Sequence, residues 1–436
     1  MDLLDYSKKV RRLANKLKLN DCELLATSTR ILSARIENRE ITMELKEGLF
    51  SAGIRVLKRN RIGYVPITEP DFTLLERGIA TALVKAPPAP FSSFVLIEKL
   101  PAELANFDPA VKKLFNSPGK IQELAQELVE LAFATGRIET IEGGINVEIE
   151  QRVVSTLHSP EVAYAEVNSK DFDFITGRKS PDLEQVIELG ATVARSLPQR
   201  ETSPEAENLR GKTIPVLLHP MMLEDLIRRL VAEHLYASAV QDGMSRFRLG
   251  ERVAPEQFMM WDDATAPYDG NTFPTDDEGT PSRKNLLIEN GILKMFLYDR
   301  ASAFKDGVES TGNGRRRPVL VEEEHEAPVR CSINDVYLAP GAESLEQMIK
   351  NIKQGLIVKT LLGFHTANRT TGDFANPLYF GGVIRNGEIA ALPEPGRWSI
   401  KGNALDCLKT VKAISRETKP VGSGVLPWVR IELTVA

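Results

Sequence analysis

Apolar residues in the first part of the chain recur first at helical and then at extended spacing. Leu3, Val10 and Leu13 follow helical intervals and predict an amphipathic opening helix. The next segments are rich in β-branched residues and partly alternate, with breaks at 46–48 and at Asn60. This pattern predicts a small antiparallel meander behind the first helix.

The pattern then alternates between further helices and strands. Good helix formers at helical spacing predict helices over 71–86, 121–134 and 181–197. Two β-branched stretches predict strands over 145–156 and 161–170. Helices and strands follow one another without regular β–α alternation, which favours an α+β fold over a doubly wound parallel sheet.

The polar stretch 199–212 has no apolar periodicity and marks a domain boundary. Beyond it the pattern predicts a short buried strand, one long helix from Met221 to about Val240, and then strands with glycine-rich loops. We therefore expect two domains joined by a linker at 201–212. The first is an N-terminal α+β domain over 1–200, and the second, over 213–436, is rich in antiparallel strands with one long helix.

Composition excludes several classes of function. The 55 basic and 60 acidic residues give a net charge of -5, which lacks the electrostatic footprint of a nucleic-acid binder. The run Arg315–Arg317 is read as a solvated loop, because three glutamates follow it closely. No apolar run approaches the ~18 residues of a membrane span. Asp2 and Asp5 stand where a signal peptide would be basic, and the three cysteines are far apart. We expect a cytoplasmic protein that contacts neither membrane nor nucleic acid directly.

Histidine spacing gives no helix-borne metal site. Such a site needs two ligands one turn apart, and His234 has Leu230 four residues before it and Ser238 four residues after it. Because His234 falls on an apolar stripe, it is predicted to be a packed, hydrogen-bonded core histidine. The string His325–Arg330 opens like HExxH, but it ends in arginine, and Pro328 would break the helix.

The acidic stretch 261–279 invites a cation-binding reading. An EF-hand is excluded, since Thr265 and Pro267 fall where oxygen ligands are required. Tight turns between strands explain the same residues, and a non-standard cation site stays open. The residue types alone therefore indicate no catalytic machinery.

Three motifs occur in a fixed order between Gly250 and Arg317. They are Asp276–Gly279, Glu289–Gly291 and Thr311–Gly314. In this order they resemble the core motifs of the TldD/PmbA family, and weaker similarity extends over the whole chain. Each motif alone also fits a scaffold, because Asn-Gly makes a hairpin turn and the glycines of the third motif let another backbone approach.

The resemblance implies a cytosolic peptidase of two subunits. The TldD-type subunit carries HExxxH on a helix and a C-terminal cysteine as zinc ligands, whereas the PmbA-type subunit, also called TldE, lacks them. Aligned without gaps, the zinc-binding segment falls on 226–231, with leucine and valine at the ligand positions and Ile227 near the general base. Cys407 lies too early to be the third ligand. The resemblance thus implies a PmbA/TldE-type chain that binds no cofactor itself, with zinc expected in its partner.

The leading hypothesis is a non-catalytic subunit that pairs with a TldD-type zinc metalloprotease and helps it bind and cleave unfolded peptides. An extended peptide would bind by strand addition, and a homodimer is an alternative state in isolation. Two other functions stay open. One is a stand-alone peptidase with a non-standard metal site near 262–278, and the other is a regulatory binding protein, as the family's gyrase-modulator name suggests.

The candidate site contains no predicted catalytic or metal-binding residue. For His325 and Arg330, ordinary surface salt bridging is the alternative. The residues predicted to face the peptide cleft or the partner are Asp276, Asp277, Glu278, Gly279, Gly312, Asn313, Gly314, His325 and Arg330.

Overall fold

The fold was obtained as a computed structural model of the 436-residue chain. The predicted helix over 181–197 and most of the predicted linker lie outside the described residues. The structure describes residues 2–98, 100, 104, 107–134, 142–172, 175–177, 209–267, 269–316, 325–391 and 396–436.

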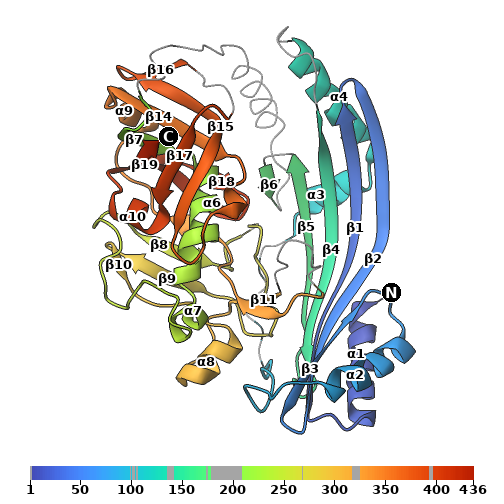
Figure 1. Ribbon diagram of the computed structural model, residues 1–436. Helices are drawn as coiled ribbons and strands as arrows, with labels where there is room; N and C mark the ends of the chain where they lie inside the picture. Colours follow the sequence, from blue (N-terminus) through green and yellow to red (C-terminus); the bar gives the residue numbers. More distant parts are fainter. Residues whose placement is uncertain are drawn as a thin grey trace.

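The first part of the chain forms a tall antiparallel sheet with helices packed on it, which we call the N-terminal layer (Figure 1). Its strand order is β3-β2-β1-β4-β5-β6. The predicted meander, the helices at 71–86 and 121–134, and both later strands are confirmed within a few residues. The strands are β1 (Asp21–Glu37), β2 (Glu40–Lys58), β3 (Arg61–Ile67), β4 (Glu142–Thr156), β5 (Ala163–Phe172) and β6 (Ile175–Gly177), and the helices are α1 (Leu3–Lys16), α2 (Phe72–Val84), α3 (Pro109–Phe115) and α4 (Pro118–Ala134).

Local chemistry explains how the layer begins. The Asp2 carboxylate caps α1 by accepting the N–H groups of Leu4 and Asp5. Apolar residues of α1 and α2 then pack on one end of the sheet, while α3 and α4 cover the other end in a separate cluster. The β2–β3 turn has positive φ at Arg59 and Asn60, as a two-residue hairpin requires.

Residues 209–436 form the second part of the molecule, which we call the C-terminal part. Its eleven-stranded sheet closes partly on itself, because β19 pairs with β7 as well as with β17, β13 and β18. The strands β7, β14, β15, β17 and β19 thus form a closed circuit, and all five contribute side chains to the large hydrophobic cluster of this part. Sheet strands are β7 (Thr213–Leu218), β8 (Met260–Asp263), β9 (Lys284–Glu289), β10 (Ile292–Leu293), β13 (Val336–Leu338), β14 (Gln354–Leu361), β15 (Asp373–Arg385), β16 (Glu388–Ala391), β17 (Ser399–Asn403), β18 (Ala413–Val421) and β19 (Gly424–Val435).

Short helices and one separate hairpin complete this part. The hairpin of β11 (Gly314–Arg316) and β12 (Val329–Cys331) reaches toward the N-terminal layer (Figure 1). The helices are α6 (Pro220–Leu226), α7 (Ala237–Gln241), α8 (Arg300–Asp306), α9 (Leu345–Lys350) and α10 (Ala404–Lys409), with a 3₁₀ turn at Phe364–Thr366. In the part of the chain that the structure describes, no helix has the length and apolar character needed to cross a membrane. The mixed, mostly antiparallel architecture confirms the predicted α+β class.

The prediction of one long helix from Met221 to about Val240 is wrong. After α6 the chain forms a π-helical turn at Ile227–Val231 and a 3₁₀ turn at Ala232–His234, and only then α7. The break has a tertiary cause. Around the extended Tyr236, Leu235 accepts a backbone hydrogen bond from Leu297, and Ala237 donates one to the same residue. These pairings replace intrahelical bonds, which an apolar sequence pattern cannot reveal.

Candidate functional site

The acidic motif Asp276–Gly279 forms a tight, buried turn. The Asp276 Oδ1 atom accepts the N–H groups of Glu278 and Thr280, at 3.0 and 2.8 Å. Gly279 has a φ of +84°, a conformation that favours glycine. All three acidic side chains are almost fully shielded from solvent. The motif is therefore organised by its own backbone before it contacts anything else.

The glycine loop at 312–314 lies against this turn. The Gly314 N–H donates to Asp276 Oδ2 at 2.9 Å, and the Asn313 amide donates to Asp262 Oδ2 at 2.8 Å. A Cβ on Gly314 would lie 2.2 Å from Glu278 Oε2, so only glycine leaves space for this approach. The structure thus brings the first and third sequence motifs into direct contact.

The acidic motif and strand β11, which follows the glycine loop, meet the N-terminal layer through buried ion pairs. Arg55 donates to Glu278 Oε1 at 2.6 Å, Arg152 donates to Asp277 Oδ1 at 2.6 Å, and Arg316 donates to Glu23 Oε1 at 2.9 Å. Within the C-terminal part, Arg315 adds a second ion pair to Asp277 at 3.0 Å. We call this cluster the ionic junction, and its residues are Glu23, Arg55, Arg152, Asp277, Glu278, Arg315 and Arg316.

Five residues of the ionic junction were absent from the predicted site. Arg315 and Arg316 are buried, so the reading of the 315–317 run as a solvated loop is wrong for both. The signal that could have identified Glu23 and Arg55 is a charged residue inside an otherwise apolar strand pattern. Such a residue is buried only if it is paired.

The pairing shifts the acidities of the carboxyl groups. Burial alone would raise the pKa of Asp277, but the guanidinium groups of Arg152 and Arg315 and the Arg316 N–H hold it well below its usual value. For Glu278, burial outweighs the attraction of Arg55, and the pKa is raised. Asp277 is therefore more firmly ionised than its neighbour Glu278.

His325 and Arg330 lie in different environments. His325 is buried against the N-terminal layer, and its backbone carbonyl accepts a hydrogen bond from the Tyr64 hydroxyl. Arg330 is exposed on β12, opposite Arg315. The predicted role of both residues at a cleft or a partner stays a prediction.

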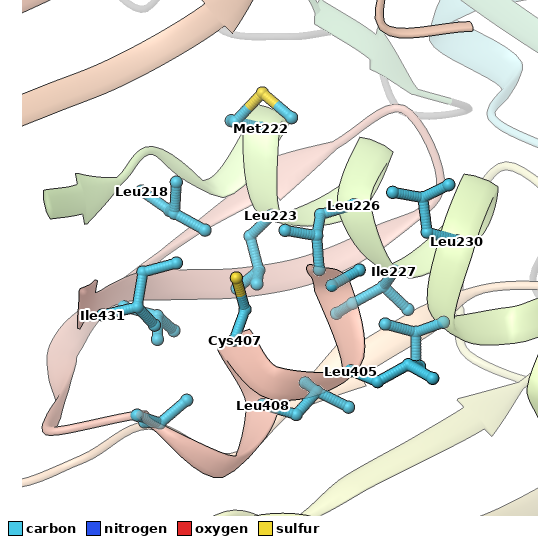
Figure 2. Packing of buried hydrophobic residues seen from close by; sticks show 14 of the residues in the cluster. Leu218, Met222, Leu223, Leu226, Ile227, Leu230, Leu405, Cys407, Leu408 and Ile431 are labelled. Carbon is cyan, nitrogen blue, oxygen red and sulfur yellow. The ribbon is translucent and has the colours of Figure 1, made fainter. Parts of the chain in front are cut away.

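The positions that the family resemblance assigns to the zinc ligands and the general base are hydrocarbon core. Leu226, Ile227 and Val231 are at most 1% exposed. Figure 2 shows Leu226 and Ile227 among the packed side chains beside α10. None of these side chains has a nitrogen, oxygen or sulfur atom to offer a metal, so a zinc ion does not fit here.

The backbone of this segment nevertheless keeps an unusual turn. Its hydrogen bonds join residues five apart, since Ala232 N–H donates to the Ile227 carbonyl. Five is also the spacing of the two histidines in HExxxH, and a π-helical turn brings residues at that spacing toward one side. In this chain, the two positions at that spacing, Leu226 and Val231, have no ligand atoms.

The nearest soft or imidazole groups cannot replace those ligands. Cys407 is buried on α10, and burial raises the pKa of its thiol to about 12, so it stays protonated. His234 is a buried core histidine, as predicted, with Nδ1 accepting the Arg246 N–H at 3.2 Å. Across the residues that the structure describes, no three His, Cys, Asp or Glu side chains are grouped so as to hold a metal ion.

The carboxylates of the acidic stretch are already hydrogen-bonded. Asp262 Oδ1 accepts the Asn334 N–H at 2.6 Å, and its Oδ2 accepts the side-chain amides of Asn313 and Asn285. The Asp335 carboxyl is bonded by Asn271. These bonds fix the loops around the ionic junction and occupy the oxygen atoms that a cation would need.

Comparison with known proteins places this geometry in a family. Residues 211–436 match the family described as the PmbA/TldA metallopeptidase C-terminal domain. A metalloprotease TldD homolog of Buchnera aphidicola is 30% identical over 215 residues, which are 49% of this chain and 42% of that protein. A metalloprotease of Methanocaldococcus jannaschii is 32% identical over 217 residues, 48% of this chain and 46% of that protein. The chain thus spans under half the length of these relatives.

Solved structures match over the full length. The crystal structure of TldE from Thermococcus kodakarensis covers 99% of this chain and 100% of that chain, with a TM-score of 0.84 and 23% identity. A structure described as a modulator of a DNA gyrase, from Thermotoga maritima, covers 100% of both chains with a TM-score of 0.81 and 22% identity. At these identities the likeness shows the fold. Together with the match over 211–436, which is more than half of the chain, it shows that this protein belongs to the TldD/PmbA family.

Proposed function

We propose that this chain is a non-catalytic PmbA/TldE-type subunit that pairs with a TldD-type zinc metalloprotease and helps it bind and cleave unfolded peptides. The observation that carries the proposal is the hydrocarbon at Leu226, Ile227 and Val231. A metallopeptidase activates water with a metal held by nitrogen, oxygen or sulfur ligands, and here the aligned positions offer none.

The comparisons support pairing at the level of the family. The relatives named as metalloproteases match about half of this chain, and the family match over 211–436 includes the segment 226–231. A solved TldE has the same fold over nearly the whole length. A chain that has the family fold but hydrocarbon at the ligand positions is suited to support a catalytic relative.

A stand-alone peptidase with a metal at the acidic stretch has less support. Asp262, Asp277 and Glu278 are each engaged by amide, guanidinium or backbone donors. Displacing those donors to admit a cation would break the buried ion pairs of Arg55, Arg152 and Arg315 with these carboxylates, which is costly. The regulatory alternative rests on the description of two structural neighbours as modulators of DNA gyrase, and the ionic junction adds nothing specific to it.

Co-purification tests the proposal. The tagged chain would be co-expressed with a TldD-type protein of the same source organism, and an unstructured fluorogenic peptide would be offered to each chain alone and to both together. We expect a stable complex that cleaves the peptide. A matched complex whose TldD-type chain has its HExxxH glutamate changed to glutamine should form equally well and be inactive.

The contradicting result is equally concrete. Either the complex with the glutamate-to-glutamine change still cleaves the peptide, or this chain alone cleaves it at a rate that depends on Asp277. In either case the catalytic groups would lie in this chain, and the proposal would be wrong.

A further inference from the structure

The two parts of the molecule have separate hydrophobic cores. Among the described residues, the large core cluster draws only on residues from Leu209 to Val435, while the two main clusters of the N-terminal layer draw on Leu3 to Val162. Apolar contacts between the parts are small. They include Phe273 against Ala165 and Val167, and Ala301 against the cluster of Leu57, Phe91 and Phe94.

The contact between the parts is instead rich in buried charge. Among the described residues, three ion pairs cross it, and all their side chains are at most 10% exposed. Two hydrogen bonds from the Arg300 guanidinium to the Ser93 carbonyl, at 3.0 and 2.6 Å, add to them. Figure 1 shows β11, which carries Arg315 and Arg316, reaching the sheet at this place.

Such a contact costs less to open than an apolar core. Buried ion pairs recover much of their energy in water, because the charges regain hydration when they separate, so their net contribution to docking is small. An apolar core regains nothing when it is exposed. Local opening therefore follows the contact with the fewest buried apolar groups, which here is the contact between the two parts.

The ionic junction also covers the family motifs. The carboxylates of Asp277 and Glu278 are held by Arg152 and Arg55 of the N-terminal layer. A Cβ on Gly279 would lie 2.8 Å from Ile97 of the same layer. A peptide or a partner can reach these motif residues only after the layer has moved away.

We infer that the N-terminal layer undocks from the C-terminal part as a folded unit, and that the ionic junction is the contact that opens. This conformational step is independent of the proposed function, since it depends on the junction and not on the missing zinc ligands. In the undocked state, the acidic turn and the glycine loop become accessible. The docked layer therefore shields the motif from ligands.

Native-state hydrogen exchange of the intact chain tests this inference. The reporters are the N–H groups of Gly314, Arg316 and Arg300, each bonded to a carboxylate of the acidic motif inside the C-terminal part. Undocking exposes these bonds to water and frees Asp277 and Glu278 from Arg152 and Arg55, so the three N–H groups exchange from the undocked state. Their opening free energy should be lower than that of the β1–β2 and β7–β19 ladder amides. Their opening free energy should also decrease less per molar of added urea than that of the ladder amides, because undocking exposes less surface than unfolding. Equal free energies and equal slopes for all these amides would overturn the inference.

A substitution sharpens the test. Arg152→Gln removes one ion pair across the contact, and we expect the three reporter amides to exchange at least about tenfold faster while both ladders keep their rates. Arg152→Lys keeps the charge and should lie closer to the wild type. The matched control is Arg229→Gln, which removes a surface pair with Asp225 inside the C-terminal part and should change none of these rates. Faster exchange throughout the protein in Arg152→Gln, or no change at the reporters, would contradict undocking.

Discussion

At the scale of single residues, Asp277 is the centre of the contact between the two parts. Its side chain is 1% exposed and pairs with Arg152 and Arg315, and its second oxygen accepts the Arg316 N–H at 2.6 Å. If this carboxylate lost its charge, the buried guanidinium groups of Arg152 and Arg315 would each lose an ion-pair partner while staying charged. That asymmetry makes the pair sensitive to substitution even where its net contribution is modest.

We therefore expect Asp277→Asn to lower the free energy of unfolding by about 3–5 kcal/mol, the usual cost of removing one partner from a buried pair. Urea denaturation followed by circular dichroism measures the change. The control is Asp225→Asn, which breaks the exposed pair with Arg229 and should cost under about 1 kcal/mol. Equal losses for both variants would show that the buried position of Asp277 has no special importance.

The raised pKa of Asp335 predicts that the stability of the fold depends on pH. Burial and the nearby Asp269 raise its pKa to about 7, against about 3.9 in an unfolded chain. Between these values the folded protein keeps a proton that the unfolded chain has lost, so stability falls as the pH rises from about 4 to about 7. Asp335→Asn should remove this slope. Its Tm relative to the wild type should therefore be higher at pH 8 than at pH 5, and a difference that does not vary with pH would contradict the assignment.

At the scale of elements, strand β2 has a glycine, Gly53, whose missing side chain leaves space for an arginine of the C-terminal part. A Cβ on Gly53 would lie 1.7 Å from Arg316 Nη1, so any side chain there would displace the guanidinium that binds Glu23. Glycine inside a strand often marks such an approach. The N-terminal sheet is thus shaped for the hairpin of β11 and β12.

Gly53→Ala should lower stability by about 1–3 kcal/mol, as overpacking does, and should speed exchange at the Arg316 N–H. Gly119→Ala is the control. Gly119 lies in α4 with nothing near its missing Cβ, and the change should raise stability by up to about 1 kcal/mol through helix propensity. Thermal unfolding of both variants compares them, and a stabilising Gly53→Ala would refute the close approach.

The same elements show what periodicity can and cannot predict. Helices α2 and α4 were predicted within three residues of their ends, because each packs one apolar face on a sheet. The prediction of one long helix from Met221 is wrong, since the break at Tyr236 depends on hydrogen bonds to Leu297, which lies far away in the sequence. The sequence predicts the acidic turn as a motif. It does not predict the ion pairs with Arg55 and Arg152, because these arginines lie on strands far away in the sequence.

At the scale of the whole molecule, two parts with their own cores meet through charge. The α+β class and the family follow from the sequence, because motif order and apolar pattern are local properties. The position of the motif between the parts does not, since it depends on how two separately folded units dock. The predicted peptide or partner contact of the motif residues stays a prediction, and the ionic junction implies that it requires undocking.

The central claim is that this chain has no catalytic metal of its own. The most direct measurement is the zinc content, by inductively coupled plasma mass spectrometry, of the purified chain and of its complex with a TldD-type protein. We expect substoichiometric zinc in the chain alone and about one zinc ion for each pair of chains in the complex. One tightly bound zinc ion per isolated chain, retained after dialysis against a chelator, would contradict the account.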